Sequence, residues 1–127
     1  MEHPVVSIGI GSYNNAAYLD ILLDSIRAQT YPAIEVIVVD DCSTDNSVEV
    51  AQRWMKRTNY PVTFVQRVAN QGLVRTYSEC TQLFTGRFVS LVGSDYVLDP
   101  DLIARTVEEF DRRGPTCGAV YSDCRLD

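Results

Sequence analysis

The sequence predicts an α/β fold: a three-layer, doubly wound, mostly parallel sheet with helices on both faces. Short apolar runs alternate with segments whose apolar residues recur at helical spacing, and these segments are long enough to hold crossover helices between parallel strands. The run at residues 36–39 contains only valine and isoleucine, which is typical of a strand buried on both faces. With 127 residues, 46% of them hydrophobic, the chain fits a single domain over residues 1–127.

Five strands are predicted from apolar, β-branched runs that stop at glycine or at polar residues. We expect them at residues 5–10, 34–39, 62–65, 87–92 and 119–121. The last is the shortest, and no closing helix follows it.

Four helices are predicted between these strands from apolar residues three and four positions apart. Their buried faces are expected to be Leu19, Leu22, Leu23 and Ile26; Val48, Ala51 and Met55; Leu73, Tyr77, Cys80 and Phe84; and Ile103, Val107 and Phe110. Ser43 is a candidate N-cap for the second helix, and Asp99-Pro100 a candidate start for the fourth. Gly86 is placed to end the third helix.

The composition excludes several classes of partner. The formal net charge is −6 and lysine and arginine form no run, so a nucleic-acid surface is not expected. No stretch approaches the ~18–20 apolar residues of a membrane span, so we expect no membrane segment in this chain.

The cysteines and the single histidine do not suggest a zinc site. Cys42, Cys80, Cys117 and Cys124 form no CxxC pair, and His3 stands alone near the N-terminus. We expect four reduced thiols in a cytoplasmic protein. A location at the inner face of the membrane stays open as an alternative.

The first predicted strand ends in the segment 9–14, which nearly matches the GxGxxG dinucleotide fingerprint. Asn14 stands where the third glycine should be, so the match is weak. What remains is Tyr13 at a strand's carboxyl end, where its ring can stack on a nucleobase. The alternative is that Tyr13 covers the start of the first helix.

Two adjacent carboxylates, Asp40 and Asp41, follow the second predicted strand. They could cap the next helix, but Ser43 already serves that purpose, and neighbouring carboxylates repel unless they meet a donor or a cation. Ligands bind at the carboxyl ends of strands in open α/β sheets. We therefore predict a site in which a carboxylate accepts a nucleobase N–H or helps to ligate a metal.

Two further positions suggest contacts with an anionic ligand. Asp95 follows the fourth strand and could hold Mg²⁺ or Mn²⁺ if a diphosphate supplies further oxygens; the alternative is an ordinary turn aspartate. Arg75, near the start of the third helix, could face an anion together with the helix N–H groups. The alternative for Arg75 is a solvated helix residue.

Several motifs in order along nearly the whole chain resemble glycosyltransferase family 2. They are residues 6–14, 28–32, 35–41 with 43–45, Asn70-x-Gly72, and 86–88 leading to Ser94-Asp95. The resemblance implies the GT-A fold, of which this chain would be the Rossmann-like donor half. It also implies inverting transfer of a sugar from a nucleotide-diphosphate donor, such as a UDP-sugar, to a hydroxyl of an acceptor glycan or lipid-linked glycan.

The resemblance also implies residue roles. Tyr13 would lie near the base and Asp41 would read it, with Asp40 in a supporting or capping role. The expected nucleotide-binding residues are Ser12, Tyr13, Asp41, Arg75 and Ser94. Asp95 matches the last metal-contacting carboxylate of the family's DxD motif, where a divalent cation, Mg²⁺ or Mn²⁺, bridges the donor diphosphate.

Some positions depart from the family pattern. Gly93 stands where the first Asp of the DxD motif is frequent, and Tyr96 where another acid is common. Tyr77 replaces a frequent arginine, and Cys42 a frequent glycine. These departures keep an alternative open, a catalytically inactive nucleotide-sugar-binding or regulatory domain.

The general base of an inverting transferase is not assigned among these residues and is expected beyond Asp127. We therefore expect this chain to be the donor-binding portion of a longer enzyme, inactive by itself. A phosphoacceptor receiver domain, which also has acidic strand ends, needs a lysine at a strand end. The only lysine, Lys56, lies inside a predicted helix.

Overall fold

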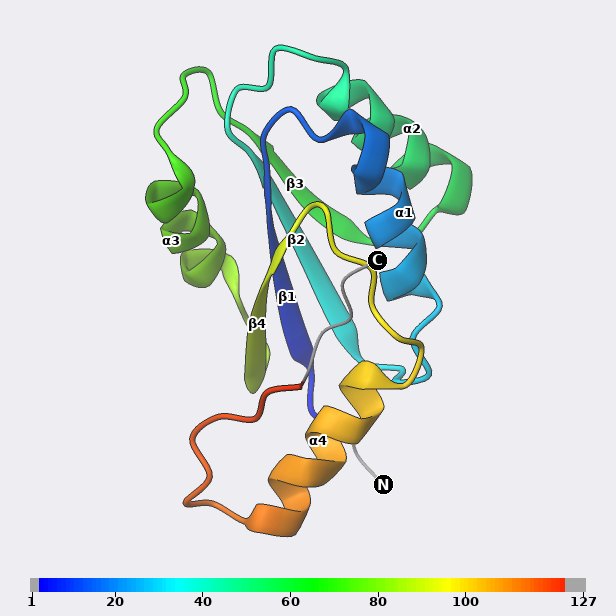
Figure 1. Ribbon diagram of the computed structural model, residues 1–127, viewed down its shortest axis with the longest axis vertical. Coiled ribbons are helices and arrows are strands. Elements are labelled where there is room, and N and C mark those ends of the chain that lie inside the picture. Colours follow the sequence, from blue (N-terminus) through cyan, green and yellow to red (C-terminus); the bar gives the residue numbers. More distant parts are fainter. Residues whose placement is uncertain (1–2, 123–127) are drawn as a thin grey trace.

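The computed structural model describes residues 3–122 and contains one parallel sheet with the strand order β3-β2-β1-β4 (Figure 1). Its strands are β1 (Val6–Ser12), β2 (Ile34–Asp40), β3 (Val62–Gln66) and β4 (Phe88–Gly93). β1 pairs in parallel with both β2 and β4, so that Ser12 lies opposite Asp40 and Gly11 opposite Gly93. This register brings the carboxyl ends of three strands to one edge.

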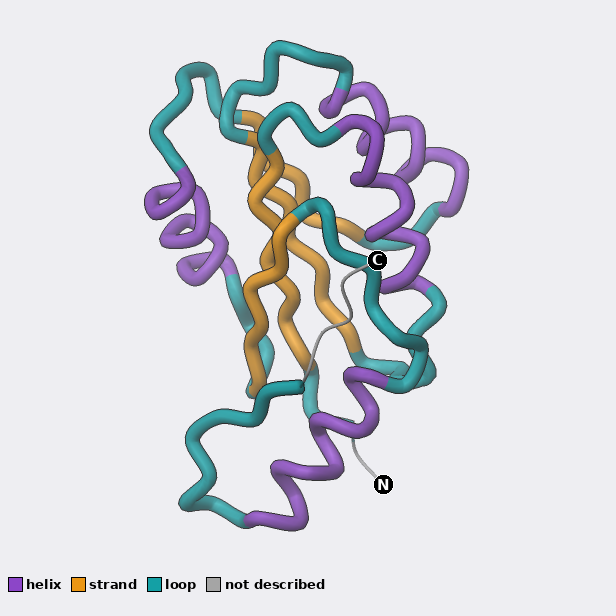
Figure 2. Tube along the Cα trace, in the orientation of Figure 1, coloured by secondary structure: helices purple, strands orange, loops and turns teal. Residues whose placement is uncertain are grey.

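Helices cover both faces of the sheet, as predicted. They are α1 (Ala16–Arg27), α2 (Ser47–Thr58), α3 (Leu73–Leu83) and α4 (Leu102–Arg113). Figures 1 and 2 show α1 and α2 together on one face, α3 on the other, and α4 beside the amino ends of the strands. No helix within residues 3–122 is long and apolar enough to cross a membrane.

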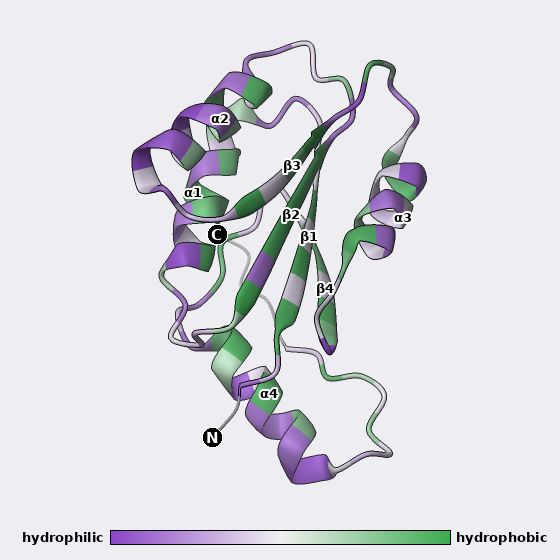
Figure 3. Cartoon of the chain, turned by 180° about the vertical axis from the view of Figure 1, so that it is seen from behind, coloured by the Kyte–Doolittle hydropathy of each residue, from purple (hydrophilic) through white to green (hydrophobic). Residues whose placement is uncertain are grey.

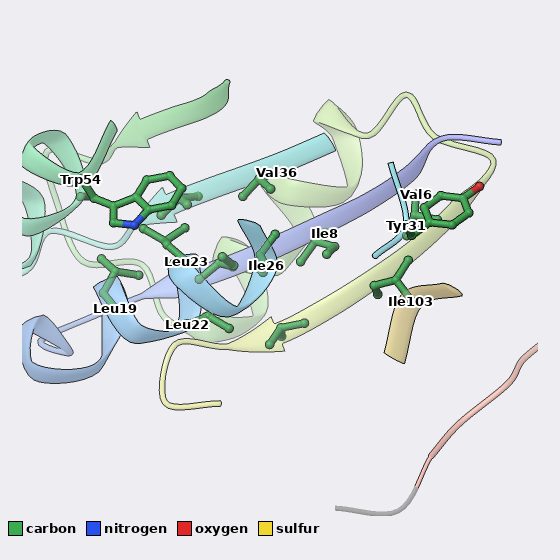
Figure 4. Close-up of a cluster of buried hydrophobic side chains, with 14 of the residues drawn as sticks. Val6, Ile8, Leu19, Leu22, Leu23, Ile26, Tyr31, Val36, Trp54 and Ile103 are labelled. Carbon is green, nitrogen blue, oxygen red and sulfur yellow. The ribbon is translucent and has the colours of Figure 1, made fainter. Parts of the chain in front are cut away.

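The larger core lies between the sheet and the face that carries α1 and α2. Even-numbered residues of β1 point into it, because side chains alternate along a strand. Figure 4 shows Ile8, Leu23 and Trp54 in this cluster. The strands are the most hydrophobic part of the molecule, in agreement with the double-sided burial predicted for residues 36–39 (Figure 3).

A smaller core joins the sheet to α3. Ile37, Val39 and Cys80 are fully buried there, with Phe84 packed beside them. A Cβ atom on Gly9 would lie only 2.7 Å from Phe84 Cζ. The odd-numbered glycines of β1 therefore allow α3 to approach the sheet closely.

A polar cluster at the amino end of this face fixes the turn between α3 and β4. Glu35 accepts a hydrogen bond from the Ser7 hydroxyl and two from Thr85, one from its backbone N–H and one from its hydroxyl, each at 2.9 Å. Gly86 donates its N–H to Ser7 Oγ at 2.8 Å. α3 ends at Leu83, so Gly86 belongs to this turn and does not end the helix as predicted.

Two predicted helix starts are wrong by a few residues. α2 begins at Ser47 with Asn46 as its N-cap, because the Ser43 side chain is bonded to Asp40 instead. α4 begins at Leu102 after Asp101, because Asp99 forms a preceding turn in which its carbonyl accepts the Leu102 N–H.

Other apolar positions also differ from the expected helix faces, and Leu73, predicted to be buried, is 61% exposed at the start of α3. In α2 the buried aromatic is Trp54, whereas Met55 is half-buried at its side. The indole N–H of Trp54 donates to Asp24 Oδ1 at 2.7 Å, which satisfies its polar atom. Phe84 lies one residue beyond the end of α3 and packs in the smaller core.

The predicted fifth strand at 119–121 is wrong. This segment is a loop, and Tyr121 is 93% exposed. It lies along a cavity of about 370 Å³ beside Phe88 and Phe110, and no backbone hydrogen bond joins residues 119–121 to a described strand. Local β propensity alone does not make a strand without a paired neighbour.

Candidate ligand site at the carboxyl edge of the sheet

A pocket of about 260 Å³ opens where β1 and β2 end. Its wall includes Ser12 at the end of β1 and Tyr13 after it, Asp41 after β2, and Asn70 and Gly72 in the loop before α3. These segments meet because parallel strands place their carboxyl ends at the same edge of the sheet. The structure thus brings together three of the predicted site residues, Ser12, Tyr13 and Asp41.

Asp41 is the buried acid of the pocket, with only 4% of its surface exposed. Its Oδ1 accepts the backbone N–H of Gln71 at 2.8 Å and its Oδ2 that of Gly72 at 2.9 Å. Its own N–H donates to the Ser12 carbonyl at 2.9 Å. Each carboxylate oxygen can accept more than one hydrogen bond, so both remain able to accept a donor from a ligand.

Asp40 has different partners from its neighbour. It is fully buried, and its carboxylate accepts the Ser43 N–H at 2.9 Å and the Ser43 hydroxyl at 2.6 Å. Successive side chains at the end of a strand point to opposite faces, which separates the two acids. These contacts agree with the supporting role expected for Asp40, whereas the base-reading role of Asp41 stays a prediction.

Asn14 joins the loop after β1 to the loop after β2 through hydrogen bonds. Its backbone has φ = 53°, a left-handed conformation that asparagine tolerates better than most residues. Its Oδ1 accepts the N–H groups of Thr44 at 2.8 Å and Asp45 at 3.2 Å, and its own N–H donates to Ser43 Oγ at 3.0 Å. In the sequence Asn14 stands out only as the residue in place of the third glycine of the dinucleotide fingerprint.

The starts of α1 and α2 share their capping groups. Asp45 Oδ2 accepts the Ala16 N–H at 3.3 Å and its Oδ1 the Ser47 N–H at 2.9 Å, while Ser47 Oγ accepts the Asn15 N–H at 3.0 Å. Burial raises the pKa of Asp45, but hydrogen bonds from Ser47 and Ala16 outweigh this, so its pKa is lowered. The two helices are therefore tied together beside the pocket.

Tyr13 and Ser12 lie at the pocket in different ways. Tyr13 is 45% exposed, which leaves ring surface for a ligand. Ser12 is 1% exposed, and within residues 3–122 its buried hydroxyl has no hydrogen-bond partner. Ser12 thus brings an unpartnered polar group to the lining of the pocket.

Ser94 and Asp95 follow β4 on the other side of Asn15. Ser94 is 2% exposed and accepts a hydrogen bond from Asn15 Nδ2. Asp95 is exposed, and it turns back over the strand end: a Cβ atom on Gly93 would lie 3.0 Å from Asp95 Oδ1. Gly93 thus leaves room for the Asp95 carboxylate.

The donor set at Asp95 fits a divalent cation only together with a ligand. Within residues 3–122 no three His, Cys, Asp or Glu side chains gather as a metal site. Mg²⁺ commonly takes one or two protein carboxylates and completes its shell with phosphate and water. Asp95 alone therefore matches a cation that is shared with a diphosphate.

Arg75 is not brought to the pocket wall. It is exposed on the first turn of α3. Its backbone carbonyl accepts a hydrogen bond from Arg67 Nη2 at 2.8 Å. The buried cation near the site is Arg67, whose side chain is 8% exposed and lies 2.6 Å from Glu79 Oε2. Nothing in the local sequence distinguished Arg67, because its partners lie on α3.

Fold and site together define an α/β domain with its ligand pocket at the carboxyl edge of a parallel sheet. Residues 7–125 match the sequence model of "Glycosyl transferase family 2". The chain belongs to this family, and its sheet and helices form the GT-A, Rossmann-like arrangement of the structural neighbours.

The similar proteins include a sequence relative and two solved structures that contain nucleotide sugars. The putative glycosyltransferase EpsH of Bacillus subtilis is 35% identical over 101 residues, which are 80% of this chain and 29% of EpsH. The mannosyltransferase PcManGT from Pyrobaculum calidifontis, in complex with GDP-Man and Mn²⁺, has a TM-score of 0.79 and 28% identity over 84% of this chain and 32% of that one. S. aureus TarS 1-349 in complex with UDP-GlcNAc has a TM-score of 0.78 and 27% identity over 85% of this chain and 31% of that one. The chain thus spans about 30% of the length of these relatives.

Proposed function

We propose that this chain is the donor-binding part of an inverting glycosyltransferase that moves a sugar from a nucleotide diphosphate to an acceptor hydroxyl. The observation that carries the proposal is the buried Asp41 carboxylate in a pocket whose rim is formed by Tyr13. Membership of the family and relatives with GDP-Man or UDP-GlcNAc support a nucleotide-sugar donor. The acceptor is a glycan or lipid-linked glycan, and the site of action is cytoplasmic.

Asp41 and Tyr13 provide complementary contacts for a nucleobase. The carboxylate already accepts one backbone N–H on each oxygen, and its remaining lone pairs accept a ring N–H of the base. The exposed Tyr13 ring offers a stacking surface, a contact worth ~1–3 kcal/mol per base in other proteins. Ser12 and Ser94 complete the nucleotide-binding set in this proposal, and the Ser94 hydroxyl also accepts a hydrogen bond from Asn15.

The diphosphate lies towards the end of β4 in this proposal. Asp95 holds a divalent cation, Mg²⁺ or Mn²⁺, together with diphosphate oxygens. Such a cation offsets the negative charge that develops on a departing nucleoside diphosphate. Arg75, on the solvent side of α3, stays a prediction as a phosphate contact.

Transfer with inversion also needs a general base for the acceptor hydroxyl. We place this base, with the acceptor site, beyond Asp127, so that the 127-residue chain binds donor without transferring sugar.

A catalytically inactive nucleotide-sugar-binding or regulatory domain is the second candidate. It is favoured by the turn after β4, where Gly93 and the half-exposed Tyr96 leave Asp95 as the one carboxylate. In that case nucleotide binding persists without a cation.

Calorimetric titration with UDP and GDP, each with and without Mn²⁺, tests the proposal. We expect binding of one nucleotide, loss of it in Asp41→Ala, and tightening by Mn²⁺ that disappears in Asp95→Ala. Asp111→Ala, an exposed acid on α4, is the matched control. Binding of neither nucleotide would contradict both candidates, whereas binding indifferent to Mn²⁺ and to Asp95→Ala would favour the inactive domain.

A further inference from the structure

The loop 68–72 forms one wall of the pocket, yet burial of its side chains does not hold it in place. Val68 is 98% exposed, and Ala69, Asn70 and Gln71 are also exposed. Burial of apolar surface therefore cannot fix the loop. Figure 1 shows it running from β3 to α3 past the carboxyl ends of the strands.

Asp41 holds the far end of this loop through the backbone N–H groups of Gln71 and Gly72. The Asn70 side-chain amide adds a bond of 3.3 Å to the Asp41 carbonyl. The same carboxylate that we assign to the base is therefore aimed by the loop.

Arg67 holds the near end. Its backbone N–H donates to the Asp40 carbonyl at 2.9 Å, which continues the pairing of β3 with β2. Its guanidinium then reaches across the loop to α3, where Nη2 lies 2.6 Å from Glu79 Oε2 and donates to the Arg75 carbonyl at 2.8 Å. The residue before the loop is thus fastened to the helix that begins where the loop ends.

This arrangement is not one that stability alone favours. The Arg67 side chain is 8% exposed and its Nε has no hydrogen-bond partner among residues 3–122, whereas the side chain of Glu79 is 35% exposed. A buried charge with an unmatched donor costs free energy, and apolar residues of similar size are often at least as stable. The pair is therefore weak evidence for stability, and what its contacts show is a tie between the residue before the loop and the helix after it.

We propose that Arg67 and Glu79 are positioning residues that clamp the loop 68–72 so that Gln71 and Gly72 aim the Asp41 carboxylate at the ligand. This inference rests on the proposed nucleotide-binding function. When the clamp is absent, the loop spends part of its time away from Asp41. The apparent Kd for a nucleotide then rises as the reciprocal of the fraction of molecules in which the loop holds Asp41, because only these molecules can bind.

The test compares the wild-type chain with the double variant Arg67→Met/Glu79→Leu, which removes both charges and so leaves no lone buried ion. Arg57→Met is the matched control, since it breaks an exposed pair with Asp24 of 3.7 Å at the far end of α2. Three quantities are measured: hydrogen exchange of the Gln71 and Gly72 amides without ligand, the Kd for UDP and for GDP, and the thermal midpoint.

In the double variant we expect a rise of about tenfold in the nucleotide Kd, which requires that the loop hold Asp41 only about a tenth of the time, and therefore exchange of both amides at close to the rate of unprotected amides. The thermal midpoint should stay close to that of the wild type, and the control should change none of the three. Unchanged exchange overturns the clamp. Exchange at the unprotected rate with an unchanged Kd overturns its role in binding. If the wild type binds neither UDP nor GDP, the proposed function fails, while the exchange rates still decide whether the pair holds the loop.

Discussion

Gly72 donates its backbone N–H to Asp41 Oδ2 at 2.9 Å, which joins the start of α3 to the end of β2 across 31 positions of sequence. A carboxylate that accepts two backbone N–H groups is fixed in orientation before any ligand arrives. Preorganised acceptors of this kind lose little freedom on binding. The pocket is therefore largely formed in the protein itself.

The exchange of Asp41 for asparagine tests this arrangement. An amide cannot accept from both Gln71 and Gly72, since its NH₂ group faces one of the two donors, so we expect the free energy of unfolding to fall by about 1–3 kcal/mol. The Kd for UDP or GDP should rise at least about tenfold, because one hydrogen bond to a charged acceptor is lost. Urea unfolding and calorimetric titration measure the two effects. Asp40→Asn is the comparison: if it weakens nucleotide binding more than Asp41→Asn does, our division of roles between the two acids is wrong.

Glu35 should make the fold sensitive to acid. Burial raises its pKa, but the hydrogen bonds from Ser7 and Thr85 lower it more, so the pKa in the folded chain is below the ordinary value. A lowered carboxyl pKa stabilises the fold above the pKa of the unfolded state, and this stabilisation is lost as the pH falls through the folded pKa. Glu35→Gln should be less stable than the wild type at pH 7, and the difference should narrow as the pH falls below about 4. A difference that stays constant from pH 7 to pH 3 in urea unfolding would show that the charge of Glu35 is not involved.

Cys42 and Asn14 form a matched pair of left-handed residues, with φ = 61° and 53°. Glycine at position 42 relieves the steric cost of a side chain in this region, so Cys42→Gly should raise the free energy of unfolding by about 0.5–1 kcal/mol. Asn14→Gly should lower it, because the Asn14 side chain accepts hydrogen bonds from the backbone of Thr44 and Asp45. Urea unfolding measures the free energy of unfolding of both variants. A change of the same sign in both would contradict the different roles that we give to Cys42 and Asn14.

Gly9 tests the close approach of α3 to the sheet. A methyl group there would meet Phe84 Cζ at 2.7 Å and Cys80 Cβ at 2.9 Å, so Gly9→Ala should destabilise the chain by about 1–3 kcal/mol through overpacking. Gly118→Ala is the control, since no atom of the described residues 3–122 lies within 4 Å of its added Cβ. If the thermal midpoint changes equally in both variants, the smaller core accommodates the added methyl group without strain.

Much of the fold was predictable because it depends on local pattern. The β-branched run at 36–39 became the buried strand β2, and the spacing of Leu19, Leu22, Leu23 and Ile26 became the buried face of α1. The positions of Asp41 and Asp95 at strand ends followed from the same alternation. Strand 119–121 was wrong because a strand needs a neighbour to pair with, which local sequence does not reveal.

The sequence by itself determined the doubly wound sheet, the family and the edge at which we expect a ligand, since periodicity and motif spacing are local properties of the chain. Only the tertiary structure decided which polar groups meet at that edge. It buried the Ser12 hydroxyl, kept Arg75 away from the pocket wall, and brought Arg67 and Glu79 together beside the loop that holds Asp41. These outcomes depend on contacts between distant segments, which form only when the strands and helices pack.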